Sequence, residues 1–146
     1  MKNSVILLVE DNQDDVELML LALKKNNITN EVIVARNGTE ALDYLFARGE
    51  HSNRERLPAL VLLDLNLPGL NGIEVLRQLR GNPETRLVPV VVLTTSGDRK
   101  DINVSYSMGA NSYVIKPVDF NRFVELVSSL GPYWLFINKL PYSTGG

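Results

Sequence analysis

Short apolar runs alternate along the chain with segments whose apolar residues are spaced as on one face of a helix. The runs have the length of strands, are rich in β-branched residues and rarely alternate with polar residues, which is typical of strands buried on both faces. They cover residues 5–9, 31–35, 60–63, 88–93 and 113–115. The helical segments cover residues 14–25, 39–48, 71–80, 99–108 and 119–130. A strand followed by a helix, five times over, predicts a doubly wound α/β fold with a parallel sheet in the middle of three layers.

The C-terminal end departs from this alternation. Gly131-Pro132 is predicted to end or kink the last helix, because proline removes a helix hydrogen bond and restricts the residue before it. Five consecutive bulky apolar residues follow: Tyr133, Trp134, Leu135, Phe136 and Ile137. One helix face cannot bury all five, so they either pack on their own domain or contact another chain. We therefore divide the chain into a domain at 1–130 and an apolar extension at 131–146.

Composition limits the classes of function. The 146 residues suffice for one well-packed domain, and 45% hydrophobic with 22% charged residues is typical of a globular protein. A net charge of -2 gives no field that favours nucleic acid or an anionic membrane. With no cysteine, thiolate chemistry is excluded, and the one histidine, His51, lies in a polar stretch (48–56) that predicts a surface loop. Neither a signal peptide nor a membrane span is recognisable, so we expect a cytoplasmic protein.

Polar side chains follow the predicted strands at the ends where parallel strands meet. Glu10-Asp11 follow the first strand, Asp64 the third, Thr94-Thr95-Ser96 the fourth and Lys116-Pro117 the fifth. Because the carboxyl ends of the strands form the binding crevice of an open α/β sheet, we expect these groups to converge.

Three carboxylates held together repel one another unless a cation lies between them. Magnesium binds a few carboxylates and keeps several waters, which fits a shallow site of this kind. The ammonium of Lys116 would add a second positive charge. Since an aspartate can act as a nucleophile toward phosphorus, these groups favour phosphoryl transfer.

Four motifs, LLVEDN at 7–12, LLDLNLPGLNG at 62–72, VVLTTS at 91–96 and YVIKP at 113–117, resemble those of the receiver domain of bacterial two-component response regulators. The resemblance covers residues 4 to about 130. It implies a flavodoxin-like (βα)5 fold. It also implies that Asp64 accepts a phosphoryl group, with magnesium (manganese as the alternative), from a phosphohistidine on a sensor histidine kinase.

The resemblance further implies roles for the neighbours of Asp64. Asp11 would bind the metal directly, Glu10 would help to position it, and Asn66 would contribute its backbone carbonyl. Thr94 would bond a phosphoryl oxygen and Lys116 would pair with it.

Other implied roles concern switching and phosphoryl lifetime. Tyr113 would turn inward when Thr94 moves, and the bond before Pro117 would be cis. Asn66, Thr95 and Ser96 occupy positions that tune the phosphoryl lifetime. Thr95 departs from the family, which usually has alanine or glycine there, and a bulkier residue is expected to restrict access and slow exchange.

The apolar extension and the long loop before the third strand resemble the small regulators paired with bacterial phytochrome kinases. This implies a homodimer formed through residues 133–137 and a downstream protein reader or phosphotransfer protein. The chain shows no output domain, so it would signal through altered protein contacts. It would catalyse only its own phosphorylation and dephosphorylation.

Several alternatives remain open at this stage. Asp64 could cap a loop, Tyr113 could be an ordinary core aromatic, and the acidic run 11–17 is interpreted mainly as a helix N-terminus, with only Asp11 chemically active. The chain could be a dimerising scaffold that is never phosphorylated. A magnesium-dependent aspartyl phosphatase is less favoured, because those enzymes carry the nucleophile after the first strand. A flavin-binding module would need a phosphate loop where Glu10-Asp11 lie.

Overall fold

Five parallel strands form the centre of the molecule, which is described by a computed structural model over residues 4–142. The strands are β1 (Ile6–Val9), β2 (Val32–Ala35), β3 (Leu60–Leu63), β4 (Val90–Thr94) and β5 (Ser112–Ile115). Their order in the sheet is β2-β1-β3-β4-β5, and every neighbouring pair is parallel. The predicted flavodoxin-like (βα)5 fold is confirmed.

The five helices begin at local sequence signals. They are α1 (Gln13–Lys25), α2 (Gly38–Leu45), α3 (Gly72–Gly81), α4 (Arg99–Ser107) and α5 (Phe120–Pro132). Each is preceded by an Asn or Asp whose side-chain oxygen accepts a backbone N–H of the first turn: Asn12, Asn37, Asn71, Asp98 and Asp119. These caps satisfy amide donors that the helix itself cannot, which explains why the predicted and observed starts agree within a residue or two.

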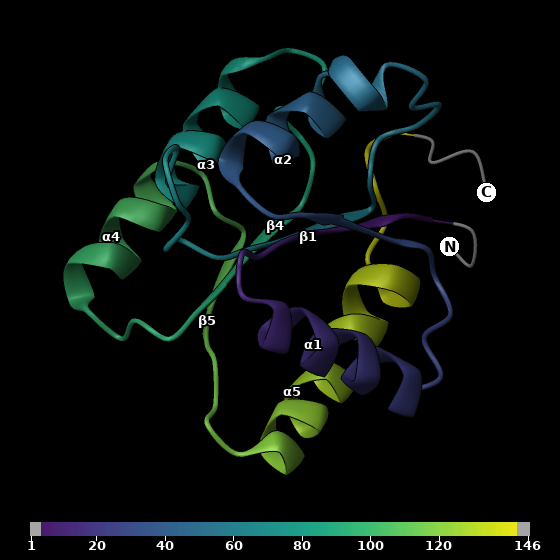
Figure 1. The fold of residues 1–146 in the computed structure, drawn as a ribbon, viewed down its shortest axis with the longest axis vertical. Helices are drawn as coiled ribbons and strands as arrows, with labels where there is room; N and C mark the ends of the chain where they lie inside the picture. The colour runs from purple at the N-terminus through teal and green to yellow at the C-terminus, as the bar shows by residue number, and fades with distance from the viewer. Residues whose placement is uncertain (1–3, 143–146) are drawn as a thin grey trace.

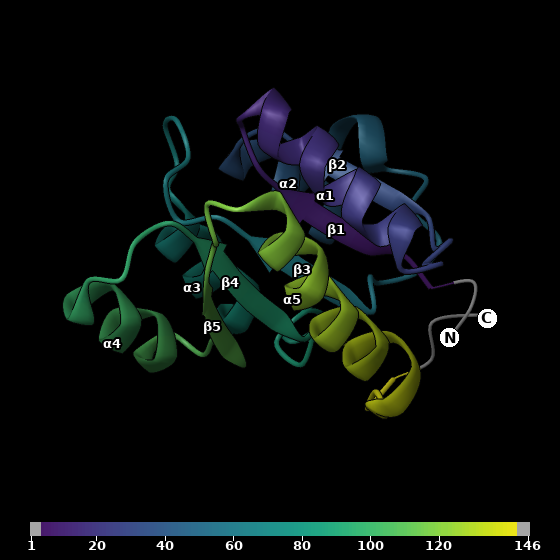
Figure 2. The ribbon, with the colours of Figure 1, turned by 90° about the horizontal axis from the view of Figure 1, so that it is seen from below.

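The helices cover both faces of the sheet. Helices α1 and α5 lie on one face, and α2, α3 and α4 lie on the other (Figures 1 and 2). Alternate strand residues therefore enter two cores. Leu7, Val61 and Val92 pack toward α2 and α3, whereas Ile6 and Leu62 pack toward α1 and α5. Burial on both faces accounts for the continuous apolar runs of the strands.

The strand register brings the polar strand ends together. Val9 is paired with Leu63 across β1 and β3, so the residues that follow them, Glu10 and Asp64, leave the sheet side by side. This is also where the strand order reverses, the place at which open α/β sheets form their binding crevice.

An end or a kink was predicted at Gly131-Pro132; the α-helix does end at Pro132, but the chain stays helical beyond it. Helix α5 runs through Pro132 and continues as a π-helical turn, η2 (Tyr133–Ile137), in which the Asn138 amide donates to the Tyr133 carbonyl at 2.7 Å. Pro132 itself has helical angles, φ -60° and ψ -36°. A proline removes one backbone donor from the helix, and the Tyr133 amide that follows donates to the Leu130 carbonyl. Full burial of Leu135 fixes the turn against the core of α1 and α5.

The segment after η2 passes from one face of the sheet to the other (Figure 1). Leu140 packs with the core of α1 and α5, whereas Tyr142 packs with the opposite core. The Tyr142 hydroxyl donates to the carbonyl of Pro58 at 2.9 Å. The extension is therefore attached to its own domain at both ends, and residues 143–146 lie outside the described part.

Two further expectations concern single segments. The predicted cis bond before Pro117 is wrong: no peptide bond among residues 4–142 is cis, in line with the preference of an X–Pro bond for trans by about 0.5–1 kcal/mol. The predicted loop 48–56 contains a short turn, η1 (Gly49–His51), and His51 is half-buried with its ring edge-on to Tyr44. Among the described residues, no helix is both long and apolar enough to cross a bilayer.

Candidate functional site

Asp64 lies at the carboxyl end of β3, almost completely buried. Its amide donates to the Val9 carbonyl at 3.1 Å, which continues the β1–β3 pairing by one residue. On its other side, the N-terminus of α3 approaches so closely that a Cβ at Gly72 would overlap the Asp64 carbonyl oxygen. The backbone of Asp64 is thus held from two sides, which fixes the direction of its carboxylate.

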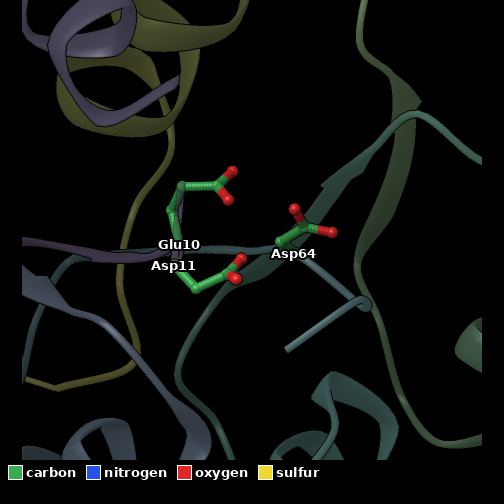
Figure 3. A group of neighbouring side chains, drawn as sticks. All are labelled: Glu10, Asp11 and Asp64. Carbon is green, nitrogen blue, oxygen red and sulfur yellow. The ribbon is translucent and has the colours of Figure 1, made fainter. Parts of the chain in front are cut away.

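Three carboxylates converge here. Oxygens of Glu10, Asp11 and Asp64 all lie within 4.8 Å of one another (Figure 3). Glu10 and Asp64 are buried, whereas Asp11 is exposed, so the group opens to solvent on one side. Hard oxygen ligands at this spacing fit a divalent cation such as Mg²⁺, which uses few protein ligands and retains waters.

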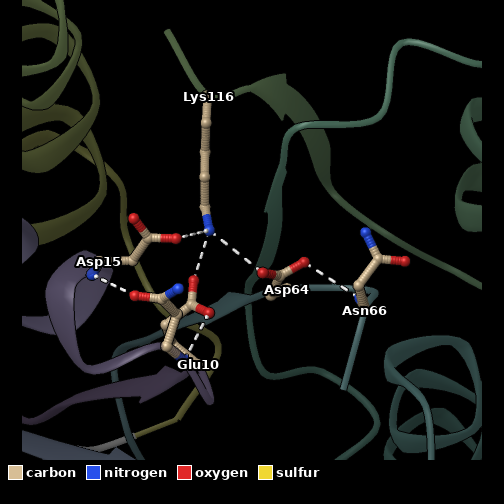
Figure 4. Close-up of polar contacts among 6 residues, drawn as sticks. Glu10, Asp15, Asp64, Asn66 and Lys116 are labelled. Carbon is tan, nitrogen blue, oxygen red and sulfur yellow. Dashed lines mark hydrogen bonds and ion pairs between the residues drawn. The ribbon is translucent and has the colours of Figure 1, made fainter. Parts of the chain in front are cut away.

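Lys116 places a positive charge inside this group from the end of β5. Its Nζ contacts a Glu10 carboxylate oxygen and lies 3.1 Å from Asp64 Oδ2 and 3.2 Å from Asp15 Oδ2 (Figure 4). The Lys116, Glu10 and Asp64 side chains are at most 10% exposed. The ammonium therefore compensates part of the buried negative charge, and the group as a whole stays acidic.

This environment shifts two pKa values in the same direction. Burial raises the pKa of Glu10 to about 7, assisted by the charge of Asp64 and opposed by the hydrogen bond from Lys116. Burial alone would lower the pKa of Lys116, but the hydrogen bond to Glu10 and the charges of Asp64 and Glu10 outweigh it and raise that pKa. The raised pKa of Glu10 thus comes mainly from its burial, and that of Lys116 from its carboxylate partners.

Thr94, at the end of β4, is completely buried, and its hydroxyl has no hydrogen-bond partner among residues 4–142. A buried hydroxyl without a partner is unfavourable by about 1–3 kcal/mol. Buried hydroxyls without a partner are uncommon in folded proteins, which makes Thr94 a candidate for a role in this site.

The residues near Thr94 do not supply a partner for its hydroxyl, because they are exposed or bonded to other groups. Thr95 is exposed, and the hydroxyl of Ser96 donates to Asp101 at 2.6 Å, so Ser96 is engaged at the start of α4. The Tyr113 hydroxyl donates to the Ser96 carbonyl at 2.8 Å, and its ring packs partly on the core of α2 and α3. Burial raises the pKa of Tyr113. The ring thus already lies partly inside the domain.

Two further residues contact this group: Asn66 contacts Asp64, and Asp15 contacts Lys116. The Asn66 amide donates to Asp64 Oδ1 at 3.1 Å, while the Asn66 side chain is exposed. Asp15 lies in the first turn of α1, in agreement with the interpretation of the acidic run 11–17 as a helix N-terminus, and its side chain also contacts Lys116. No local pattern in the sequence indicated this contact, because Lys116 lies 101 positions further along the chain.

The match to known proteins agrees with this geometry. The profile of the response regulator receiver domain matches residues 6–128, which includes Glu10, Asp64, Thr94 and Lys116. The chain belongs to the response regulator receiver domain family. The convergence of acidic residues with a lysine at one sheet edge is what the polar residues at the predicted strand ends indicated.

Three relatives cover nearly the whole receiver chain. Response regulator Rcp1 of Synechocystis is 41% identical over 137 residues, 94% of this chain and 92% of its own. Its Mn²⁺-bound crystal structure superposes with a TM-score of 0.87, at 40% identity, covering 95% of this chain and 99% of that one. The crystal structure of the phosphorylated cyanobacterial phytochrome response regulator RcpA superposes with a TM-score of 0.90 at 38% identity, covering 96% of this chain and 99% of that one. The structure of the bacteriophytochrome response regulator AtBRR superposes with a TM-score of 0.76 at 49% identity, covering 94% of this chain and 99% of that one.

Proposed function

We propose that this receiver domain takes a phosphoryl group onto Asp64 from a phosphohistidine of a sensor histidine kinase. The observation that carries the proposal is the meeting of Asp64 with two further carboxylates and the Lys116 ammonium at the β1–β3 crevice. An Asp64 oxygen attacks phosphorus, the phosphorus–nitrogen bond breaks, and the histidine leaves with the electron pair and takes up a proton.

Glu10, Asp11 and Asp64, with the backbone carbonyl of Asn66, are the residues we assign to the metal. Their oxygen donors suit Mg²⁺, with Mn²⁺ as the alternative that the Rcp1 crystal structure supports. When bound, the cation supplies positive charge to the carboxylates and to the transferred phosphoryl oxygens.

Thr94 and Lys116 respond to the phosphoryl group in this proposal. The free hydroxyl of Thr94 gains an acceptor, and the Lys116 ammonium pairs with a phosphoryl oxygen. Movement of Thr94 toward Asp64 vacates space near Tyr113, whose hydroxyl is tied to the Ser96 carbonyl before α4. Phosphorylation would thereby change the surface formed by α4, β5 and α5. Asn66, exposed Thr95 and Ser96 are proposed to tune the phosphoryl lifetime.

Partners follow from the relatives and from the extension. Phytochrome-linked relatives favour a phytochrome histidine kinase as the donor, and a downstream reader or phosphotransfer protein as the receiver of the signal. We expect this exchange to occur in the cytoplasm. The chain would catalyse only its own phosphorylation and dephosphorylation.

The extension is proposed to form a homodimer interface. On η2, Tyr133, Phe136 and Ile137 are 47%, 48% and 64% exposed, whereas Leu135 is buried and Trp134 partly packs on the core. Only three of the five predicted residues are thus freely available. The boundary at residue 130 separates two proposed roles and not two structural units, because α5 continues past residue 130 without a break.

The direct test is the intact mass of the protein after incubation with Mg²⁺ and acetyl phosphate, or with a phosphorylated histidine kinase. One added phosphoryl group in the native protein, absent in Asp64→Asn and absent with EDTA, is the expected result. Asp43→Asn serves as a matched control, because this aspartate lies outside the carboxylate group and, among residues 4–142, pairs only with Arg48 at the surface. No addition from either donor would leave a dimerising scaffold.

A further inference from the structure

Asp15 differs from the other carboxylates that contact Lys116. It lies in the first turn of α1, with its side chain 38% exposed, against 5% for Glu10 and 10% for Asp64. It is not one of the three carboxylates grouped for a cation. Its polar side-chain contact is with Lys116, at 3.2 Å (Figure 4).

The Lys116 ammonium has no donor to spare in this arrangement. An ammonium offers three N–H donors, and three carboxylates of residues 4–142 contact it: Glu10, Asp15 and Asp64. A phosphoryl group on Asp64 brings three strong acceptor oxygens, one of which can replace the present contact of Lys116 with the Asp64 carboxylate. For Lys116 to pair with a second phosphoryl oxygen, its contact with Glu10 or with Asp15 must be released.

Exposure decides which contact is released most easily. A half-exposed carboxylate regains water when it loses its partner, whereas a buried one is left without solvation. Glu10 and Asp64 are buried, so Asp15 is the acceptor that Lys116 can leave at the lowest free-energy cost. Its negative charge also stays close to the position where the phosphoryl charge arrives, and like charges repel.

We propose that Asp15 is a positioning residue that holds the Lys116 ammonium toward α1 in the unphosphorylated protein and so weakens the site's affinity for a phosphoryl group. The inference rests on the proposed function of Asp64. Asp15 contacts neither phosphorus nor the attacking oxygen, and it acts only through Lys116.

The test measures binding of beryllofluoride, a phosphoryl mimic, at saturating Mg²⁺ by fluorine NMR. Asp15→Asn is expected to bind it roughly two- to fivefold more tightly than the native protein, the range of a partly exposed ion pair. Asp14→Asn is the matched control, since it removes the same charge from the same helical turn at an exposed residue for which no contact with Lys116 exists. Asp15→Glu, which restores the charge, is expected to return the affinity toward the native value.

The outcomes separate the two ideas. If the native protein binds beryllofluoride, the role of Asp15 is overturned by either of two results. One is that Asp14→Asn and Asp15→Asn bind beryllofluoride with equal affinity, and the other is that Asp15→Asn binds it more weakly than the native protein. If the native protein binds no beryllofluoride and accepts no phosphoryl group, the proposed function fails and this inference fails with it. Thermal unfolding of each variant checks that the fold is retained.

Discussion

The Nζ of Lys116 lies 3.1 Å from Asp64 Oδ2, although 52 positions separate the two residues in the chain. Both side chains are only 10% exposed. The sheet order makes this contact, because β3 and β5 flank β4 and their carboxyl ends point to the same edge. An ion pair at such depth holds its geometry, but losing one partner leaves the other charged and buried.

Lys116→Met is therefore expected to lower the free energy of unfolding by about 3 kcal/mol when no divalent ion is present. Adding Mg²⁺ should recover much of this loss, because a second cation then compensates the carboxylates. Urea unfolding with EDTA and with Mg²⁺ measures both effects. Lys100→Met, at an exposed position, is the control and should change little. An equal loss with and without Mg²⁺ would contradict the charge argument.

Metal-free protein is expected to lose stability as the pH rises from about 5.5 to about 7.5. The native state keeps a proton on Glu10, with its pKa of about 7, at pH values where the unfolded chain has lost it, so deprotonation favours unfolding. The raised pKa of Lys116 contributes stability throughout this window and does not reverse the sign. Urea midpoints in EDTA at the two pH values test this. Glu10→Gln should remove most of the slope, and an unchanged slope would show that another group causes it.

Thr94→Val should stabilise the resting protein by up to about 1 kcal/mol, because it replaces an unpartnered buried hydroxyl with a methyl group. The same change should abolish the structural response to phosphorylation. Thr85→Val is the matched control: Thr85 is equally buried, but its hydroxyl donates to the Leu79 carbonyl at 2.6 Å, so its loss should destabilise. Chemical unfolding compares the two, and destabilisation by both variants would show that the Thr94 hydroxyl has a partner.

Arg80 should be important for stability far from the phosphorylation site. It donates to the carbonyls of Gly109, Arg86 and Val88 and to the Asn111 side chain, at 2.7 to 3.0 Å. Arg80→Lys is expected to destabilise by about 2 kcal/mol, because an ammonium cannot reproduce the planar fork of donors.

Two comparisons test this role of Arg80. Arg77→Lys is the control, since Arg77 makes only a surface pair with Glu74, and it should be nearly neutral. Gly109→Ala should resemble Arg80→Lys, because a Cβ there would lie 2.9 Å from Arg80 Nε at a residue with φ of 101°. Urea unfolding measures all three, and a neutral Arg80→Lys would argue against the network.

The proposed homodimer interface predicts that Phe136→Ser combined with Ile137→Ser gives a monomer without unfolding the protein, because both side chains are exposed on η2. Sedimentation velocity measures the change. Truncation would be a poorer test, since it also removes buried Leu135 and the Tyr142 contact. Leu20→Ser, at an exposed leucine of α1, is the control. A monomer in every variant, the native protein included, would remove the dimer from the proposal.

The sequence by itself determined the order of elements and which polar residues stand at the carboxyl ends of the strands, because those depend on local signals. Apolar runs define the strands, Asn and Asp caps start the helices, and polar residues at parallel strand ends must share an edge. The residues Glu10, Asp11, Asp64, Thr94 and Lys116 were all predictable in this way.

Only the tertiary structure decided which partner each of these groups has. Local rules predicted that Gly131-Pro132 would end or kink the last helix; α5 does end at Pro132, but the chain stays helical through η2, where Leu135 is buried. They assigned Asp15 to a helix N-terminus, yet packing of α1 beside the end of β5 brings it to Lys116. Contacts between segments far apart in the chain, and the burial that makes them strong or costly, arise only when the sheet and its two helical layers are assembled.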